Sequence, residues 1–217
     1  MRRLLLFVCV GWLAIVAVLL IHDGLPGLWQ MAVKLLIHQP VPKPLPFKEY
    51  TEAVRTEMMA ARAATKADDH ARAAAHYTAA LELEPGPNSA SVDLHIMRGS
   101  AYNSLGDASN AFADFDTAIR TGHPIIPLGD DGIRAFMGRG YALLQLRDYG
   151  RAKADFDAVL EKLPNDVPRS SSTLAWRGAA YQGLGARARA VADYRAALAL
   201  DPSNSRAKQA LQDLDER

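Results

Sequence analysis

The amino-acid sequence predicts an all-α solenoid of about four consecutive helix pairs, closed by a C-terminal capping helix. The prediction rests on a pattern that recurs at fixed phase: a small residue, an often aromatic residue three positions later, an alanine, another aromatic and a closing proline. This pattern starts at residues 54, 92, 133 and 171, so its steps are 38, 41 and 38 residues. A unit of this length cannot bury its apolar side alone, and stacked units share a continuous core.

The last repeat, residues 171–204, carries the pattern most completely. Its members are Gly178, Tyr181, Ala190, Tyr194, Ala197 and Pro202. The equivalent residues are Gly99, Tyr102, Ala111, Phe115 and Ala118 in 92–125; Gly140, Leu143, Ala152, Phe156 and Val159 in 133–166; and Ala61, Ala64, Ala73, Tyr77 and Ala80 in 54–87. Three repeats place an arginine directly before the glycine, at Arg98, Arg139 and Arg177. The small residues are expected to let paired helices approach closely, and the aromatics to fill the space between repeats.

Each repeat is expected to form two antiparallel helices, A and B. The expected pairs are 52–66 with 69–84, 92–105 with 108–121, 132–146 with 149–162, and 172–184 with 186–200. The length beyond the usual period of about 34 residues is assigned to short linkers at 88–91, 126–132 and 167–170. Residues 205–217 are expected to carry the capping helix, because the last repeat cannot bury its outer side alone.

An uninterrupted apolar run, LLLFVCVGWLAIVAVLLI, occupies residues 4–21. A helix of this length rises about 27 Å, close to the hydrocarbon core of about 30 Å. We therefore expect residues 1–22 to form an uncleaved transmembrane signal anchor in contact with the lipid bilayer. A cleaved signal peptide fits less well, because the run is long and no small-x-small site follows it. Arg2 and Arg3 precede the run, so the positive-inside rule predicts a single-pass protein of a bacterial inner membrane, with a cytoplasmic N-terminus and a periplasmic repeat domain.

Two short segments separate this run from the repeats. Residues 23–38 hold apolar side chains at helical spacing but are too short to span a bilayer. An interfacial amphipathic helix and a helix packed on protein are the two alternatives. Residues 39–47, QPVPKPLPF, contain four alternating prolines, which favour an extended spacer of roughly 28 Å. A docking site for a proline-reading domain is the alternative there.

The sequence predicts no catalytic residue, no metal site and no cofactor. The chain holds 25 basic and 24 acidic side chains, and residues 1–50 account for five of the basic and two of the acidic ones. The remainder is therefore slightly acidic, which argues against nucleic-acid binding. The one cysteine lies in the apolar run, and the histidines lack metal-ligand spacing. Residues 130–132, Asp-Asp-Gly, are similar to part of a calcium loop but lack the ligands that should follow, so a helix-starting turn is preferred. The Asp-Phe-Asp tripeptides at 114–116 and 155–157 are predicted to lie on a solvated outer surface.

Residues 54–204 resemble tetratricopeptide repeat proteins in the phase of their small and aromatic residues. The resemblance implies a right-handed superhelix whose concave face is lined by helices A, and a non-enzymatic scaffold that binds a protein or peptide on that face. The partner-binding residues that it implies are Arg55, Met58, Arg62, Lys66, Asn103, Arg134, Met137, Tyr141 and Gln145. Met58 and Arg62 stand where the chaperone-binding subtype has lysine and asparagine, so that subtype is not expected.

Together these features predict a membrane-tethered scaffold for protein–protein interaction, in the assembly or stabilisation of a cell-envelope or membrane complex. The three basic residues of the first helix A, with Met137 and Tyr141 further along, would suit a partner segment with acidic residues beside a large apolar side chain. Solvation of these basic residues, or contact with anionic lipid, is the alternative. The alternative function is an accessory subunit of a membrane enzyme complex, which it would contact mainly through residues 1–47.

Overall fold

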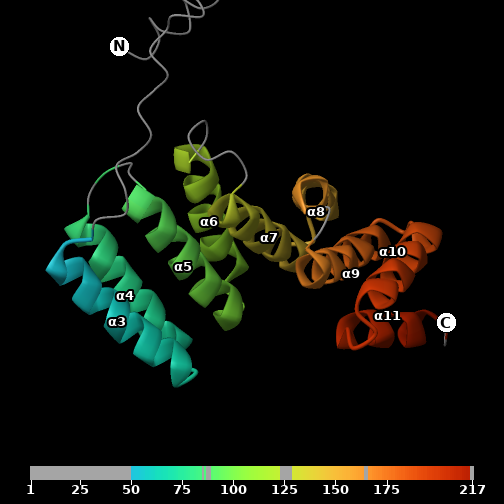
Figure 1. The fold of residues 1–217 in the computed structure, drawn as a ribbon, viewed down its shortest axis with the longest axis horizontal. Helices are drawn as coiled ribbons and strands as arrows, with labels where there is room; N and C mark the ends of the chain where they lie inside the picture. Colours follow the sequence, from blue (N-terminus) through green and yellow to red (C-terminus); the bar gives the residue numbers. More distant parts are fainter. Residues whose placement is uncertain (1–49, 85, 87–88, 123–128, 164–165, 216–217) are drawn as a thin grey trace, which may run out of the picture. The chain divides into compact units, whose positions relative to one another are not determined.

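The computed structural model describes residues 50–84, 86, 89–122, 129–163 and 166–215. Over these residues the chain is all-α, with nine helices and no strand (Figure 1). The helices are α3 (Glu52–Lys66), α4 (His70–Leu83), α5 (Ser89–Leu105), α6 (Ala108–Gly122), α7 (Asp130–Gln145), α8 (Tyr149–Lys162), α9 (Val167–Gly183), α10 (Arg187–Leu200) and α11 (Ser205–Asp215). The predicted solenoid of four helix pairs with a C-terminal helix is therefore confirmed.

The predicted anchor (1–22), amphipathic segment (23–38) and proline-rich spacer (39–47) lie outside the described residues. Among the helices that are described, none has the length and apolarity needed to cross a bilayer.

Side-chain caps fix several helix starts. Asp69, Asp148 and Asp166 each accept a hydrogen bond from the backbone N–H three residues on, at the starts of α4, α8 and α9. Because Asp166 caps it, α9 begins at Val167, five residues before the expected start at 172. α5 likewise begins at Ser89 rather than 92. Most of the residues assigned to linkers at 88–91 and 167–170 are thus first turns of helices A, and that part of the prediction was wrong.

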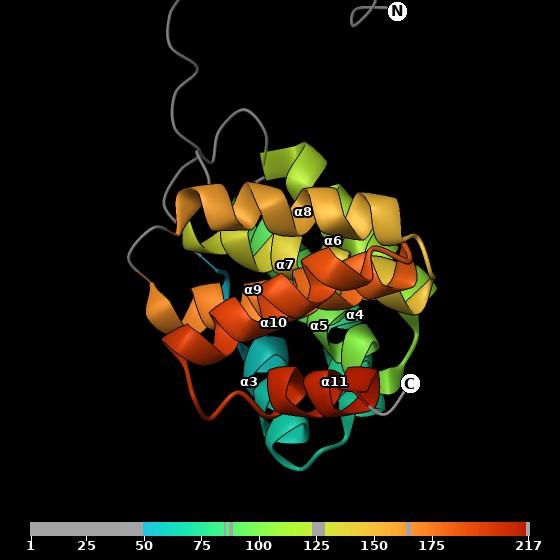
Figure 2. The same cartoon turned by 90° about the vertical axis from the view of Figure 1, so that its right-hand side faces the viewer.

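The helices pack with their neighbours in the chain, so each helix pair lies against the next (Figure 1). From α5 onwards the helices A also contact one another directly, because α5 packs on α7, α7 on α9 and α9 on α11. The helices B of successive repeats make no comparable contacts within the described ranges. The helices A therefore form the inner side of the array, and we call their exposed surface the helix A face. Figure 2 views the array from its C-terminal end, where α11 continues this face beyond α9.

A glycine of helix A and an aromatic ring of helix B interlock within the repeats. A Cβ atom on Gly140 would lie 2.7 Å from the Phe156 ring, which is fully buried. The equivalent distances are 3.1 Å for Gly99 with Phe115 and 2.7 Å for Gly178 with Tyr194. The predicted close approach of helices at the small residues is confirmed.

Gly138 adds a contact between repeats that the repeat pattern did not predict. A Cβ atom on Gly138 would lie 2.2–2.7 Å from three atoms of the Phe115 ring. Phe115 of α6 is therefore wedged between Gly99 of its own repeat and Gly138 of the next.

We expect Gly138→Ala to lower the free energy of unfolding by about 1–3 kcal/mol, because a buried aromatic ring must move to admit the methyl group. Urea unfolding followed by circular dichroism measures the change. Gly150→Ala is the matched control, since a Cβ atom there meets nothing within 4 Å. It is expected to be neutral or to stabilise by up to about 1 kcal/mol, because alanine favours helix. Equal urea midpoints of unfolding for the two variants would contradict the close packing of Phe115 against Gly138.

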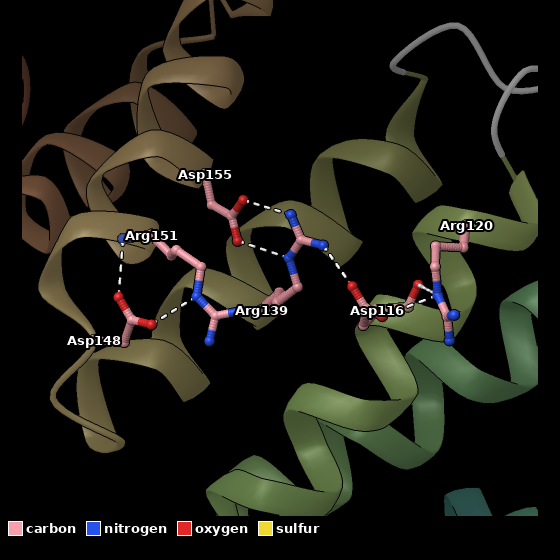
Figure 3. Close-up of polar contacts among 6 residues, drawn as sticks. All are labelled: Asp116, Arg120, Arg139, Asp148, Arg151 and Asp155. Carbon is pink, nitrogen blue, oxygen red and sulfur yellow. Dashed lines mark hydrogen bonds and ion pairs between the residues drawn. The ribbon is translucent and has the colours of Figure 1, made fainter.

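Three arginines of helices A join successive repeats, Arg139 and Arg177 through ion pairs and Arg98 through a hydrogen bond to a hydroxyl group. We call Arg98, Arg139, Arg177 and their acceptors the arginine ladder. Arg139 donates from Nε and Nη2 to the carboxylate of Asp155 in its own repeat, at 2.9 and 2.7 Å (Figure 3). Its Nη1 donates to Asp116 of the preceding repeat at 2.9 Å. Each guanidinium thus links two helices B to one helix A with charge-assisted, partly bidentate hydrogen bonds.

The same geometry recurs at the other two arginines. Arg177 donates to Asp193 at 2.7 and 2.8 Å and to Asp157 at 2.8 Å. Arg98 donates to Asp114 at 2.8 and 2.7 Å and to the Thr78 hydroxyl at 3.0 Å.

The prediction that both Asp-Phe-Asp tripeptides lie on a solvated surface was wrong for their first residues. Asp114 and Asp155 are only 4% and 5% exposed. Burial alone would raise the pKa of Asp114, but hydrogen bonds from Arg98 and His95 outweigh burial and lower that pKa. For Asp155, burial outweighs the hydrogen bonds from Arg139, so its pKa is raised. The signal was present in the sequence, because each arginine precedes its buried aspartate by 16 residues.

Candidate partner-binding surface

The first helix A presents three of the predicted partner-binding residues. Arg55, Arg62 and Lys66 are exposed on α3. Arg55 lies 3.7 Å from the Glu52 carboxylate, an exposed pair of small energetic weight. Met58, also predicted to bind a partner, is 5% exposed and packs in the core around Ala61 and Tyr77. The structure therefore places Met58 beneath the surface that it was expected to form.

Asn103 acts between helices. Its Nδ2 donates to the carbonyl oxygen of Gly138 at 3.0 Å and so ties α5 to α7. Its Oδ1 is buried and has no hydrogen-bond partner among the described residues. The predicted Met137 is half-buried against Ile133, Val159 and Leu163, whereas Gln145 is exposed at the end of α7.

Tyr50 and three residues of helices A form a polar cluster near the start of α3. The Tyr50 hydroxyl donates to Asp93 Oδ2 at 2.6 Å, and Asp93 is 4% exposed. Nη1 of the predicted Arg134 lies 3.5 Å from Asp93 and 3.3 Å from Asp131. Burial and the hydrogen bond to Asp93 raise the pKa of Tyr50. The residue that leads into α3 is therefore hydrogen-bonded to the N-terminal part of α5, a contact that the repeat pattern did not predict.

A cavity of about 250 Å³ opens beside this cluster. It is lined by Thr65, His70, Tyr77, Met97, Ser100, Ala101, Ser104 and Arg134. Burial raises the pKa of Tyr77, an effect that the positive charges of Arg62 and Arg134 oppose. His70 Nδ1 is buried without a hydrogen-bond partner in the described part of the chain. One arginine, several hydroxyl groups and one thioether line this cavity, which suits a polar or acidic group beside an apolar one.

An aromatic cluster lies towards the C-terminal end of the helix A face. The rings of Tyr141 and Trp176 meet edge to face, with centroids 4.5 Å apart and an interplanar angle of 68°. The guanidinium carbon of Arg206 in α11 lies 3.4 Å from the centroid of the Trp176 ring. Sequence reasoning predicted Tyr141 and missed Trp176 and Arg206. Arg206 could have been found by extending the repeat pattern by one period, because α11 starts 34 residues after residue 171.

The described residues hold no group of three or more side chains that could bind a metal ion. Asp130, the first residue of the suspected calcium-loop fragment, begins α7, and its carboxylate accepts a hydrogen bond from Arg169 at 2.6 Å. The prediction of a helix-starting turn is therefore confirmed.

Stacked helix pairs with glycine–aromatic interlocks, and a face with exposed cationic and partly buried aromatic side chains, define a repeat scaffold. The model of the tetratricopeptide repeat family matches residues 58–124 and 137–205, and the chain belongs to this family. Its members are generally non-enzymatic scaffolds that bind protein or peptide partners. No curated protein sequence matches the chain.

Several solved structures share the fold. MamA 41-end from Desulfovibrio magneticus RS-1 superimposes with a TM-score of 0.62 at 20% identity, covering 75% of this chain and 84% of that one. A tetratricopeptide repeat protein from Parabacteroides merdae gives a TM-score of 0.57 at 19% identity, covering 73% and 57%. The first such domain of human RPAP3 gives 0.50 at 21% identity, covering 63% and 95%. At these identities the similarity concerns the fold alone.

Proposed function

We propose that the protein is a membrane-tethered scaffold that holds a segment of a partner protein against the helix A face, in the assembly or stabilisation of a cell-envelope complex. The observation that carries the proposal is the unpaired positive charge of α3: Arg62 and Lys66 are exposed, and neither forms an ion pair within the part of the chain that the structure describes. Tyr141 and Trp176 supply partly buried aromatic surface further along the same face. A partner segment with acidic residues beside a large apolar side chain complements both parts.

Charge reversal on α3 tests this proposal. Full-length protein carrying Arg55→Glu with Arg62→Glu is expected to bind its co-purified partner at least about tenfold more weakly, equivalent to about 1.4 kcal/mol. The residual binding should depend less on salt, because the lost contacts are electrostatic. Binding is measured at two salt concentrations by biolayer interferometry.

The control reverses two exposed arginines on helices B, Arg72→Glu with Arg195→Glu. This variant carries the same change in net charge and is expected to bind within about twofold of the parent, which is less than about 0.5 kcal/mol. Equal weakening in both variants would show that net charge, and not the helix A face, governs binding.

The membrane tether of the proposal is supported by the apolar run at residues 4–21. Deleting residues 1–22 is expected to release the protein from membranes that otherwise retain it through carbonate washing. Protease added outside spheroplasts is expected to digest the repeats. Digestion of the repeats in inverted vesicles but not in spheroplasts would show that the orientation is opposite to the one proposed.

A second candidate function is an accessory subunit of a membrane enzyme complex. It is favoured by the apolar and proline-rich composition of residues 1–47. Cross-linking distinguishes the two functions, because cross-links confined to residues 1–47 would support the accessory subunit, and cross-links to the helix A face would support the scaffold.

A further inference from the structure

Arg206 has a different environment from the arginines that hold the repeats together. Arg98, Arg139 and Arg177 each donate to one or two carboxylates, and hydrogen bonds to Asp114, Asp155 and Asp193 raise their pKa values. Arg206 instead lies face-on against Trp176, and no described residue offers it a carboxylate. Burial lowers its pKa. The attraction between the guanidinium and the Trp176 ring offsets the water lost on that face, and no hydrogen-bond donor of Arg206 is used by a carboxylate of the described residues.

The stacked geometry leaves the recognition edge of this guanidinium open. A distance of 3.4 Å between the guanidinium carbon and the Trp176 centroid requires the two planar groups to lie nearly parallel. The N–H groups of a guanidinium point outwards in its own plane, where a carboxylate binds with two parallel hydrogen bonds. Stacking on Trp176 therefore orients the donors without using them, and Arg206 stays exposed on its outer side.

Tyr141 completes the walls of this position. Its ring meets Trp176 edge to face and is partly buried, and its phenol is close enough to interact electrostatically with Arg206. The two rings offer apolar surface for the methylene groups of a side chain whose carboxylate lies at the guanidinium edge.

We propose that Tyr141, Trp176 and Arg206 form an acceptor site for an acidic side chain of a bound protein segment. This inference rests on the proposed scaffold function and extends its binding surface over α11. The helix that caps the core through Ala207 and Leu214 then also supplies the cation that ends the binding face.

Trp176 itself reports on the site. The chain has three tryptophans, and the other two are Trp12 and Trp29 in the N-terminal segment. In full-length protein with Trp12→Phe and Trp29→Phe, in mild detergent, Trp176 is the single source of tryptophan fluorescence. The probe is the peptide Leu-Glu-Glu-Leu with both ends blocked. A blocked Leu-Gln-Gln-Leu peptide tests the charge, and a Leu-Gln-Gln-Leu peptide with a free C-terminal carboxylate tests a chain terminus as the source of the anion.

The glutamate peptide is expected to change Trp176 emission at concentrations at least about tenfold lower than either glutamine peptide, which corresponds to about 1.4 kcal/mol. Arg206→Gln should remove this preference. Arg206→Lys should weaken it, because an ammonium group neither stacks on an aromatic ring as a planar group nor binds a carboxylate with two parallel hydrogen bonds. Arg195→Gln, an exposed arginine of α10, is the control that should retain the preference.

Equal responses to the glutamate and glutamine peptides, or an unchanged preference in Arg206→Gln, would overturn the acceptor site. A stronger response to the free C-terminus would overturn the assignment to an acidic side chain. Circular dichroism checks that each variant is folded, and Arg206→Lys tests the site if Arg206→Gln is not. If the peptides fail while Arg55→Glu with Arg62→Glu still weakens partner binding, the scaffold proposal stands and the acceptor site alone is wrong.

Discussion

Replacing Arg139 by methionine is expected to lower the free energy of unfolding by about 3–5 kcal/mol, as removal of one partner from a buried ion pair typically does. Only 18% of the Arg139 side chain and 6% of the Asp155 side chain are exposed. Methionine fills most of the vacated volume, so the main cost is the uncompensated charge left on Asp155. The variant also loses the hydrogen bond to Asp116, which is one of the contacts between repeat three and repeat two.

Urea unfolding measures this loss, and two further variants identify its cause. Arg120→Met removes an exposed arginine that pairs with the same Asp116 and should cost less than about 1 kcal/mol (Figure 3). Arg139→Met combined with Asp155→Leu removes both charges and should recover most of the stability. If the double variant were no more stable than Arg139→Met alone, the buried charge would not be the cause.

Phe156→Ala is expected to cost about 3–5 kcal/mol, because a fully buried ring is lost and a cavity is left behind. The ring fills the space that Gly140 leaves open. Once the ring is removed, that space can be closed only if a helix moves. Leu146→Ala, at an exposed turn between α7 and α8, is the control and should cost less than about 1 kcal/mol.

Urea unfolding followed by circular dichroism measures both changes. If Phe156→Ala unfolded at the same urea concentration as the parent, the pairing of a helix A glycine with a helix B aromatic would not stabilise the repeats. Gly140→Leu is a complementary test, since overpacking at the same contact is expected to cost about 1–3 kcal/mol.

The helix pairs could be predicted from the sequence because their packing depends on residues at a constant spacing. The contact between Gly140 and Phe156 recurs at equivalent positions in the repeats before and after it, so periodicity alone places these residues. The start of α9 could not be placed in this way. It depends on the local cap at Asp166, and the repeat pattern carries no information on capping.

The candidate site was less predictable, because side-chain exposure depends on neighbours distant in the chain. Met58 occupies a repeat position that is often exposed, yet in this first repeat it packs around Ala61 and Tyr77. The partners of Tyr50 and Arg206 lie on other helices, 43 residues away at Asp93 and 30 residues away at Trp176. For the same reason Asp114 and Asp155 were wrongly predicted to be solvated. The pattern of their own helix does not show that an arginine of another helix pairs with each of them.

The arginine ladder also limits how the array can grow. At the ladder position of Asp116 and Asp157, the last repeat has Arg195, so a further arginine-bearing repeat added after it would meet a like charge. An internal duplication of residues 133–170 would instead provide the added arginine with an aspartate in its own repeat and one in the preceding repeat, as Arg139 and Arg177 have. The charge order along the helices B thus favours lengthening the array between existing repeats over adding an arginine-bearing repeat after the last one.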